Sequence, residues 1–385
     1  MKKTVKKTCG SQRMRQWFVL TALIIAGMFR AQAQNVATIG TTPYGTLQDA
    51  VTAAQDGDVI TVVDNVNPSE VQNITINKSL TITAATPGAY TIKDHHLTLS
   101  GATVELTVNG LNFEGNSYIN ANNGKKLTVD HVNATVNPQK ITGRSAFIVL
   151  GTSESTTGLD FTLTNSNIVN TFGTDYYGAY VFGWAFLNSA NISNNIFGSA
   201  DYRCHFVGVK LMNVTADAEY HFSENTFYGI NDYAFIAFDL YQNNSRANSY
   251  TALSSNNILN VEIVGGGEVY AFDIERNGNS NAQIVVLDNS TTINGNPITT
   301  NDFLNEIAPA QFNGHYAVDV AMDADGKYTS GTYSENVTKD FCAPGYAAFA
   351  NGTDPETYTI AEAYSVFYNS NTNEPVKDTA YVQKL

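Results

Sequence analysis

The sequence is poor in basic residues, and this deficit excludes several classes of partner. Lysine and arginine together number 21 among 385 residues, against 35 aspartates and glutamates. Seven of the basic residues lie within positions 1–34, which contain no acid. The rest of the chain therefore holds 14 basic and 35 acidic residues, a net charge of −21. Such a surface repels nucleic acid and acidic polymers and attracts cations. We predict no nucleic-acid partner.

Long hydrophobic runs are also scarce. The apolar run at 17–28 follows a basic stretch and precedes the small residues Ala31, Gln32 and Ala33. This order is typical of a secretory signal peptide. The run is short for a membrane span, and no other long apolar run follows it. We predict a protein that is secreted or displayed at the cell surface, with residues 1–34 as the signal peptide and no transmembrane segment after cleavage. An N-terminal anchor is the alternative.

Cysteine is nearly absent. Cys9 falls within the predicted signal peptide, which leaves Cys204 and Cys342. Either these two form a disulfide in an oxidising compartment or they are separate buried thiols, because a sequence does not show whether two cysteines meet.

The chain does contain a repeat. The unit is an apolar residue, about three polar residues rich in Asn and Ser, and one or two further apolar residues. Its copies lie at 163–168, 192–197, 222–227 and 253–258, and their first residues are 29, 30 and 31 positions apart. A fixed period of this size indicates stacked supersecondary units.

A second series of apolar segments alternates with the first. These segments lie at 147–150, 180–184, 206–209, 235–238 and 270–274. Two series with nearly one period imply at least two short strands per repeat. The sequence therefore predicts an all-β right-handed parallel β-helix in which each coil pairs with the next. An antiparallel sandwich is the alternative. Asn suits the turns, and Asn residues at matching positions of successive coils are expected to form a hydrogen-bonded ladder.

The chain divides into four predicted parts. Residues 1–34 are the signal peptide, 35–63 an N-terminal strand and capping helix, 64–299 the β-helix, and 300–385 an irregular segment that packs on the solenoid or extends it. The helix is predicted at 46–55, because Thr46 is a suitable N-cap and Leu47, Ala50, Val51 and Ala54 share one face. It would cover the open end of the solenoid.

Two later segments have local predictions of their own. Residues 301–308 are predicted as a short helix. The acidic turn at 323–326 resembles part of a calcium loop but lacks the remaining ligands, which favours a plain hairpin. We predict no cofactor, with calcium left open.

Eight short segments near the two ends of the chain carry a family resemblance. They are TIG at 38–40, GTL at 45–47, DAV at 49–51, AQDGDVITV at 54–62, SGTYS at 330–334, FCAPGY at 341–346, NGT at 351–353 and YTI at 358–360. These segments resemble bacterial exported β-helix surface proteins related in fold to pectate lyases, which include adhesin-like and glycan-interacting members. The resemblance implies export and the β-helix fold more than any reaction.

Motifs of known β-helix enzymes are missing. The Asn-x-Asp, Asp-Asp, Gly-His-Gly and Arg-x-Lys set of polygalacturonase-like members does not occur. Arg203, His205 and Lys210 form the only basic cluster of the central coils, either as base and charge clamp of a lyase or as ordinary turn residues and ion-pair partners. The pairs His95-His96 and Asp130-His131 are predicted to be surface polar residues.

Three Asp-Tyr pairs stand out. They are Asp175-Tyr176, Asp201-Tyr202 and Asp232-Tyr233. If they lie at matching positions of successive coils, they form a column of carboxylates and phenols about 4.8 Å apart. Either this column binds a ligand, or each Asp opens a turn and each Tyr packs on the coil edge.

The second apolar series adds an outward face. Its outward residues are predicted to include Tyr180, Phe182, Trp184, Phe206, Lys210, Phe235, Asp239, Tyr270 and Phe272. Either the 300–385 segment covers this face, or it is an open aromatic platform for sugar rings.

The sequence supports three functions. The first is a non-catalytic protein that binds a polysaccharide or a host or cell-surface glycan, with Asp175, Tyr176, Trp184, Asp201, Tyr202, Arg203, Lys210, Asp232, Tyr233 and Asp239 as ligand-binding residues. The second is a polysaccharide lyase or glycoside hydrolase that uses the face around Asp201, Arg203, Asp232 and Asp239. The third is a purely structural module. The oligomeric state does not follow from the sequence.

Overall fold

The structure is a computed structural model, and its described residues cover most of the chain up to residue 298 and short strands beyond. The described ranges are 35–140, 145–151, 158–171, 178–183, 186–212, 214–242, 250–264, 267–276, 284–298, 302–305, 314–322, 328–333, 357–359, 368–369 and 374–375. The predicted signal peptide and Cys342 lie outside these ranges.

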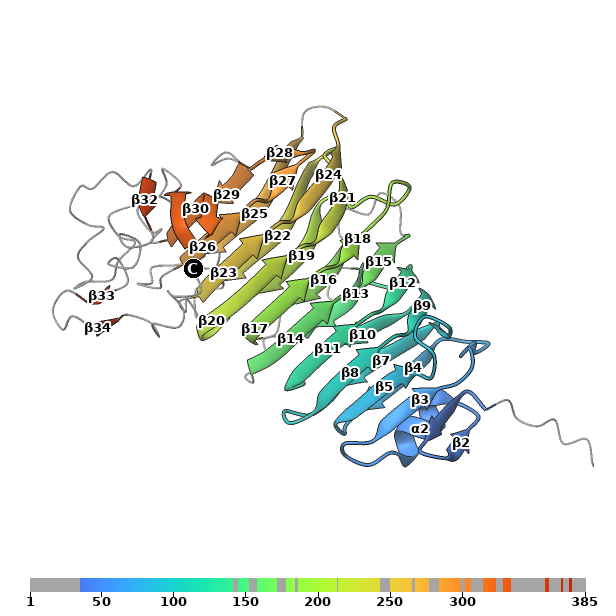
Figure 1. Ribbon diagram of the computed structural model, residues 1–385. Coiled ribbons are helices and arrows are strands. Elements are labelled where there is room, and N and C mark those ends of the chain that lie inside the picture. Colours follow the sequence, from blue (N-terminus) through green and yellow to red (C-terminus); the bar gives the residue numbers. More distant parts are fainter. Residues whose placement is uncertain are drawn as a thin grey trace, which may run out of the picture.

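Three long sheets run side by side along the molecule (Figure 1). In spatial order, sheet A consists of β2 (Thr42–Tyr44), β1 (Ala37–Ile39), β3 (Val59–Val62), β5 (Leu80–Ala84), β8 (Glu105–Asn109), β11 (Lys126–Asp130), β14 (Gly158–Thr164), β17 (Phe186–Ser193), β20 (Val214–Ser223), β23 (Tyr250–Ser255), β26 (Ile284–Asn289), β30 (Gly314–Met322), β31 (Tyr328–Tyr333) and β32 (Thr357–Thr359). Sheet B consists of β6 (Thr91–Lys93), β9 (Asn112–Gly115), β12 (Asn133–Val136), β15 (Asn167–Asn170), β18 (Ile196–Phe197), β21 (Thr226–Ile230), β24 (Ile258–Glu262), β27 (Thr292–Ile293) and β28 (Asn296–Pro297). Sheet C consists of β4 (Gln72–Ile76), β7 (His95–Leu99), β10 (Tyr118–Asn120), β13 (Ser145–Leu150), β16 (Gly178–Gly183), β19 (Val207–Met212), β22 (Ala234–Gln242), β25 (Glu268–Arg276) and β29 (Phe303–Asn305). A separate pair is β33 (Tyr368–Asn369) with β34 (Glu374–Pro375).

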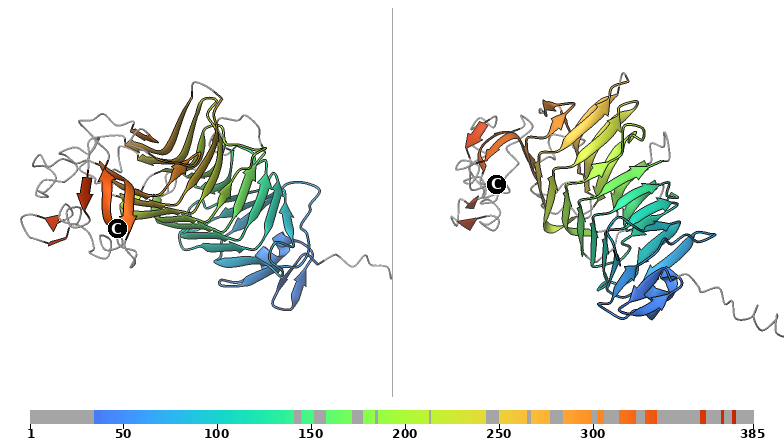
Figure 2. Two further views of the ribbon diagram at one scale, coloured as in Figure 1. Left: turned by 45° about the horizontal axis from the view of Figure 1, so that its top comes forward. Right: turned by 45° about the vertical axis from the view of Figure 1, so that its right-hand side comes forward.

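The chain visits sheets A, B and C in turn, and each strand pairs in parallel with the strand one coil later. β11, β12 and β13 form one such coil, and β14 returns to sheet A beside β11. Figure 2 shows the same stack from two further directions. The predicted right-handed parallel β-helix is therefore confirmed, and the sandwich alternative is excluded. Each repeat unit spans the corner between sheets A and B, so it supplies parts of two strands. The second apolar series supplies the strands of sheet C, and a coil therefore has three strands.

A buried ladder of asparagines links successive coils at this A–B corner. Asn195 Nδ2 donates to Asn225 Oδ1 at 3.0 Å, and Asn225 Nδ2 donates to Asn257 Oδ1 at 2.9 Å. The backbone N–H groups of Asn195 and Asn225 donate to the same acceptors, Asn225 Oδ1 and Asn257 Oδ1. The three side chains are buried. The predicted ladder is thus present, and it satisfies backbone groups that a tight corner would leave without partners.

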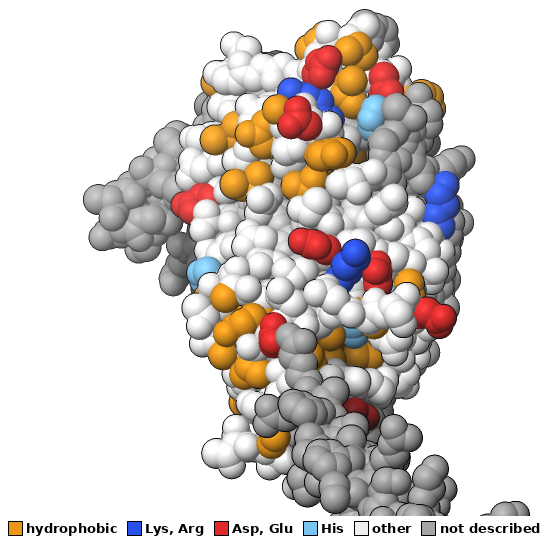
Figure 3. Space-filling model, turned by 90° about the vertical axis from the view of Figure 1, so that its right-hand side faces the viewer, with side chains coloured by type: hydrophobic (Ala, Val, Ile, Leu, Met, Phe, Trp, Pro, Cys, Tyr) orange, Lys and Arg blue, Asp and Glu red, His pale blue; other side chains and the backbone are white. Residues whose placement is uncertain are grey.

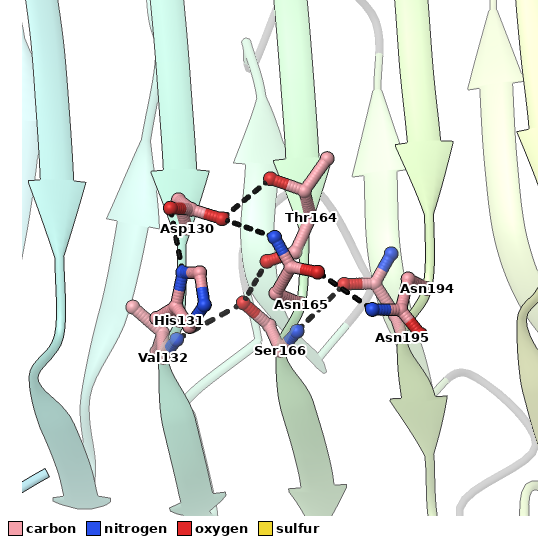
Figure 4. Close-up of polar contacts among 8 residues, drawn as sticks. All are labelled: Asp130, His131, Val132, Thr164, Asn165, Ser166, Asn194 and Asn195. Carbon is pink, nitrogen blue, oxygen red and sulfur yellow. Dashed lines mark hydrogen bonds and ion pairs between the residues drawn. The ribbon is translucent and has the colours of Figure 1, made fainter.

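The ladder ends in hydroxyl groups on the earlier coils. Ser166 takes the matching position, and its backbone N–H donates to Asn195 Oδ1 at 3.0 Å. The Ser166 hydroxyl in turn accepts the Val132 N–H at 3.0 Å (Figure 4). The side-chain acceptor therefore occurs as Asn on three coils and as Ser on one, and the still earlier coils have Val132 and Leu111 at this position.

The residue before each ladder position has a left-handed backbone. Asn165, Asn194, Glu224 and Asn256 have φ between 51° and 58°. Asn tolerates this conformation better than most residues because its short side chain bonds locally. On the surface, Asn194 Nδ2 donates to Asn165 Oδ1, and Asn165 Nδ2 donates to Asp130 Oδ1 (Figure 4). The run of adjacent asparagines in the repeat is explained by these two roles.

The fourth copy of the repeat is offset by one residue from its prediction. Strand pairing aligns Leu163 with Ile192 and Ile192 with Phe222, but it aligns Phe222 with Ser254 instead of Leu253. The turn residues still match, since Asn225 bonds Asn257. The apolar residue at 253 suggested the wrong register because Ser254, which is also buried, takes the inward position and bonds Asp288.

The N-terminal end of the solenoid is capped as predicted. The helix α2 spans Leu47–Ala53, and the Thr46 hydroxyl accepts the Asp49 N–H at 3.0 Å. Leu47, Ala50 and Val51 are buried in the main core. A second short strand, β2 (Thr42–Tyr44), precedes the helix and pairs with β1. The pair extends sheet A, and Pro43 suits an edge strand.

Parallel pairing continues beyond residue 299. β29 pairs with β25 and β30 pairs with β26. The predicted helix at 301–308 is wrong where the structure describes it, because Phe303–Asn305 is a strand that follows the register of sheet C. β30 and β31 form the predicted antiparallel hairpin, and its turn at 323–327 lies outside the described residues.

His95 and His96 are buried, so the prediction of two surface residues is wrong. Each is 2% exposed. His96 stacks on Tyr118 of the next coil, with ring centroids 4.0 Å apart, and its Nδ1 lies 2.7 Å from Asn73 Oδ1. Burial lowers the pKa of both imidazoles, which favours their neutral forms at neutral pH.

We expect Asn225→Ala to lower the free energy of unfolding by about 2–4 kcal/mol, because it leaves the Asn195 N–H and the Ile192 carbonyl buried without their present partner. Asn133→Ala is the matched control, since Asn133 is exposed and bonds only across the outer surface; it should cost less than about 0.5 kcal/mol. Urea unfolding of both variants measures the difference. Equal losses would contradict a special role for the buried ladder.

We expect the buried histidines to make the fold acid-sensitive. Their pKa values are lowered in the folded state, so the unfolded chain binds protons that the folded chain rejects once the pH falls below about 6.5. The free energy of unfolding should decrease as the pH falls from about 7 to 5, and the slope should be smaller in His95→Gln/His96→Gln. Urea titrations at several pH values test this. An unchanged slope in the double variant would refute it.

A candidate binding surface at the corner between sheets B and C

Five of the predicted site residues gather where sheet B turns into sheet C. Asp201, Tyr202 and Arg203 lie in the connection between β18 and β19, and Asp232 and Tyr233 lie in the connection between β21 and β22. The same corner of the next coil contributes Glu262, Ile263 and Val264. We call Tyr202, Arg203, His205, Asp232, Tyr233, Glu262, Ile263 and Val264 the corner surface.

The Asp-Tyr pairs do not form the predicted column. Cys204 pairs with Gly229, so Asp201 and Tyr202 come before this bridge, whereas Asp232 and Tyr233 come after it. The connection at 199–203 is an excursion that the next coil lacks, and it moves the first pair out of register. Asp175 and Tyr176 lie outside the described residues, as does Trp184.

The corner surface exposes large apolar side chains. Tyr202 is 45% and Tyr233 65% exposed, and Ile263 and Val264 are also exposed. Figure 3 shows hydrophobic side chains gathered with acidic and basic ones over the later coils of this face. Exposed aromatic groups beside charges are typical of a binding surface rather than of a solvated turn.

Arg203 ties three coils together. Its Nη1 donates to the carbonyl oxygens of Gly229 at 3.3 Å and Asn260 at 3.1 Å, and its Nε lies 3.1 Å from a Glu262 carboxylate oxygen. The guanidinium also lies 5.8 Å from the centre of the Tyr228 ring. Arg203 is therefore a structural clamp that fixes the corner, and its charge is largely matched by Glu262.

Two further contacts join the β18–β19 connection to the β21–β22 connection. His205 Nδ1 lies 2.8 Å from Asp232 Oδ2, and the Phe206 ring meets the Tyr233 ring edge-on with centroids 5.5 Å apart. These contacts hold the exposed face of Tyr233 in place. A rigid aromatic side chain loses little entropy when a ligand stacks on it.

The buried Asn231 holds the described residues of the connection between β24 and β25 by hydrogen bonds. It is 3% exposed, its Oδ1 accepts the Val264 N–H at 2.9 Å, and its Nδ2 donates to the Gly267 carbonyl. The exposed Ile263 and Val264 are thus on a fixed turn. Sequence reasoning missed these two residues and Glu262; the available signal was their place at the same corner, about one period after Asp232.

Lys210 and Asp239 do not belong to the corner surface. They are paired neighbours on β19 and β22 of sheet C, joined by an ion pair, and Lys210 lies 5.1 Å from the Tyr241 ring centre. Lys210 lies within β19, whereas His205 precedes this strand. Asp239 is 2% exposed. The predicted basic cluster of Arg203, His205 and Lys210 is therefore divided between two places.

The outward aromatic face predicted for sheet C is only partly correct. Phe272 aligns with Phe238 and points inward, and Phe235 and Tyr180 also pack in the main core. Strand irregularities changed the alternation that the prediction assumed. Phe182 does belong to a second cluster with Ala146, Val149 and Ala179, and all four are buried. The outer face there is covered rather than an open platform.

The phenols near the corner are poor proton carriers. Burial raises the pKa of Tyr180, which packs on Phe197 beneath the corner, well above its ordinary value. Burial and the Glu268 carboxylate, which accepts a hydrogen bond from the Tyr270 hydroxyl, raise the pKa of Tyr270 to about 12. Neither group serves as a general base at neutral pH.

The described residues contain no group of three or more His, Cys, Asp or Glu side chains placed to hold a metal ion. Asp323 and Asp325 of the calcium-like turn lie outside those residues. Within the same ranges, no helix is long and apolar enough to cross a membrane.

Comparison with known proteins gives no assignment. No family model, no curated protein and no solved structure matches this chain. The fold and the corner surface are therefore the basis on which a function can be argued.

We expect Arg203→Met to lower the free energy of unfolding by about 1–3 kcal/mol, because two carbonyl oxygens lose a charged donor. Lys125→Met is the control, since Lys125 and Glu105 form an exposed ion pair that should contribute little to stability. Urea unfolding compares the two. A larger loss in Lys125→Met would contradict the clamp assigned to Arg203.

Proposed function

We propose that this chain is an exported β-helix protein, secreted or displayed at the cell surface, that binds a glycan without chemically changing it. The proposed binding site is the corner surface with the neighbouring Asp201. In this role the protein attaches to a polysaccharide or to a host or cell-surface glycan. Export is supported by the basic, apolar and small-residue order of positions 1–34.

The observation that carries the proposal is the pair of exposed tyrosines. Tyr202 and Tyr233 belong to successive coils, and both expose much of their surface. A sugar ring has apolar C–H faces that pack on aromatic rings, and its hydroxyl groups donate to carboxylates. Asp201 is exposed beside Tyr202, and Asp232 precedes Tyr233. Stacking groups and hydrogen-bond acceptors are thus available on one surface.

Binding is favoured over catalysis because the basic side chains are already committed to structure. A lyase needs a base that reaches the sugar ring together with a charge that stabilises the developing anion. Arg203 is held by backbone carbonyls and Glu262, and His205 contacts Asp232. Lys210 is 12% exposed at its side chain and pairs with the buried Asp239. This arrangement supports a surface that holds a glycan.

The rod shape suits attachment. A solenoid grows along one axis, and each coil contacts mainly its neighbours. Binding groups on consecutive corners therefore follow one another along the rod, although the first Asp-Tyr pair is out of register with the second. The contacts of Arg203 across three coils hold these groups in place.

We expect Tyr202→Ala/Tyr233→Ala to weaken glycan binding by about tenfold or more, since each aromatic contact contributes about 0.5–1.5 kcal/mol beyond buried area. Val59→Ala is the control, because Val59 is an exposed apolar residue on β3, near the N-terminal end of the solenoid. This variant should bind as the unaltered chain does. A glycan array identifies the ligand, and titration gives the affinities.

The same glycans should be incubated with the protein, with and without calcium, and assayed for new reducing ends and unsaturated products. We expect neither product. Product formation would replace the proposal with a polysaccharide lyase or glycoside hydrolase. Binding that is equal in the tyrosine variant and the control would remove the corner surface from consideration.

A further inference from the structure

The N-terminal end of the solenoid contains a cavity of about 820 Å³. It lies between the start of α2, the loop at 64–69 and the first strands of sheet C. This volume is in the usual range for small-molecule sites, about 300–1,000 Å³. The cavity is at the opposite end of the coil stack from the corner surface, so neither site depends on the other.

Polar side chains replace apolar ones where the core reaches this cavity. Ile74 and Leu97 pair across β4 and β7 and are buried in the core. Gln72 and His95 pair two positions earlier, and side chains alternate along a strand, so they share this inward face. Both line the cavity. Gln72 is half-buried and its Nε2 donates to the Glu70 carbonyl oxygen at 3.0 Å, which leaves its amide oxygen, Oε1, as the acceptor on this side.

The contacts of His95 define what it presents to the cavity. Its Nδ1 lies 2.6 Å from the Lys93 carbonyl oxygen. A carbonyl only accepts, so Nδ1 carries the proton and Nε2 of the neutral ring is an acceptor. Among the described residues, Nε2 has no hydrogen-bond partner, and it is accessible from the cavity rather than fully buried. A ligand with a hydroxyl or N–H donor satisfies this nitrogen.

The remaining walls restrict the ligand further. Asp49 from α2 and Asp64 from the loop add carboxylates, of which Asp49 is exposed and Asp64 already accepts the Asn65 N–H at 2.7 Å, and none of the described lining residues is Lys or Arg. Anionic ligands are therefore disfavoured. The buried side chains of Leu47 and Val66, with Pro68, form an apolar part of the wall. The acceptors come from three separate elements, so the ligand must carry several donors spaced around an apolar body.

We propose that this cavity is a binding site for a neutral sugar residue. A sugar ring has hydroxyl donors on its circumference for His95, Asp49 and Asp64, and C–H faces for the apolar wall. A small ammonium ion has its donors at one point and does not reach acceptors on three elements. An acidic sugar meets two carboxylates and no described basic side chain.

The test titrates the purified full-length protein with a neutral hexose, an N-acetylated hexosamine, a hexosamine with a free amine and a uronic acid. Calorimetry and ligand-observed NMR measure the affinities. We expect saturable binding of at least one neutral sugar and no preference for the amine or the acid. His95→Leu and Gln72→Leu, which place apolar groups at inward positions, should each weaken binding by about tenfold.

Thr75→Ala is the matched control, because Thr75 is exposed on β4 and is not part of the cavity wall. It should bind as the unaltered protein does, and so should the Tyr202→Ala/Tyr233→Ala variant. If His95→Leu does not fold, Gln72→Leu and the ¹⁵N shift of His95 Nε2 on titration give the same information.

Three results would overturn the proposal. They are the absence of saturable binding by any neutral sugar, tighter binding of the free amine or the acid, and undiminished affinity in the folded His95 and Gln72 variants. Loss of binding in the tyrosine variant but not in the cavity variants would assign the sugar to the corner surface instead.

Discussion

The structure depends on the hydrogen-bonded stacking of one coil on the next at the A–B corner. A parallel β-helix must turn its chain three times per coil without leaving buried backbone groups unpaired. In the coils of Asn195, Asn225 and Asn257 the turn at this corner is two residues long, with the first residue left-handed and the second an Asn whose amide bonds to neighbouring coils. Because each amide acts as acceptor and donor at once, the ladder fixes the register of the sheets on either side of it.

The fixed A–B corner leaves the B–C corner free to vary in length. The connection at 199–203 is longer than its counterpart on the following coil, and the strands resume register afterwards at Val207 and Ile236. The exposed tyrosines and the Arg203 clamp lie in these variable connections. A rigid repeat with variable loops at one corner is a common arrangement for binding, since the scaffold positions side chains that the loops contribute.

The core is packed differently at the N-terminal end of the solenoid than in its middle. In the middle, the core is filled by apolar side chains, including the stacked rings of Phe197 and Phe227 with centroids 4.7 Å apart. At the N-terminal end the core must meet a helix instead of another coil. The helix α2 has only 7 residues and covers the end incompletely, which leaves a cavity bordered by Gln72 and His95. Polar residues at core positions occur where this packing stops.

The sequence by itself determined the β-helix, its period, the capping helix and the asparagine ladder, because these features repeat and each copy reports on the same backbone geometry. It also predicted Tyr202, Arg203, Asp232 and Tyr233 as candidates for a binding site, since aromatic and charged residues interrupt the repeat. Only the tertiary structure decided which of them meet. Whether Asp201 stacks on Asp232, whether Lys210 joins Arg203, and which way His95 points depend on loop lengths and strand irregularities. These shift the register by one or a few residues, and a shift of one residue moves a side chain to the other face.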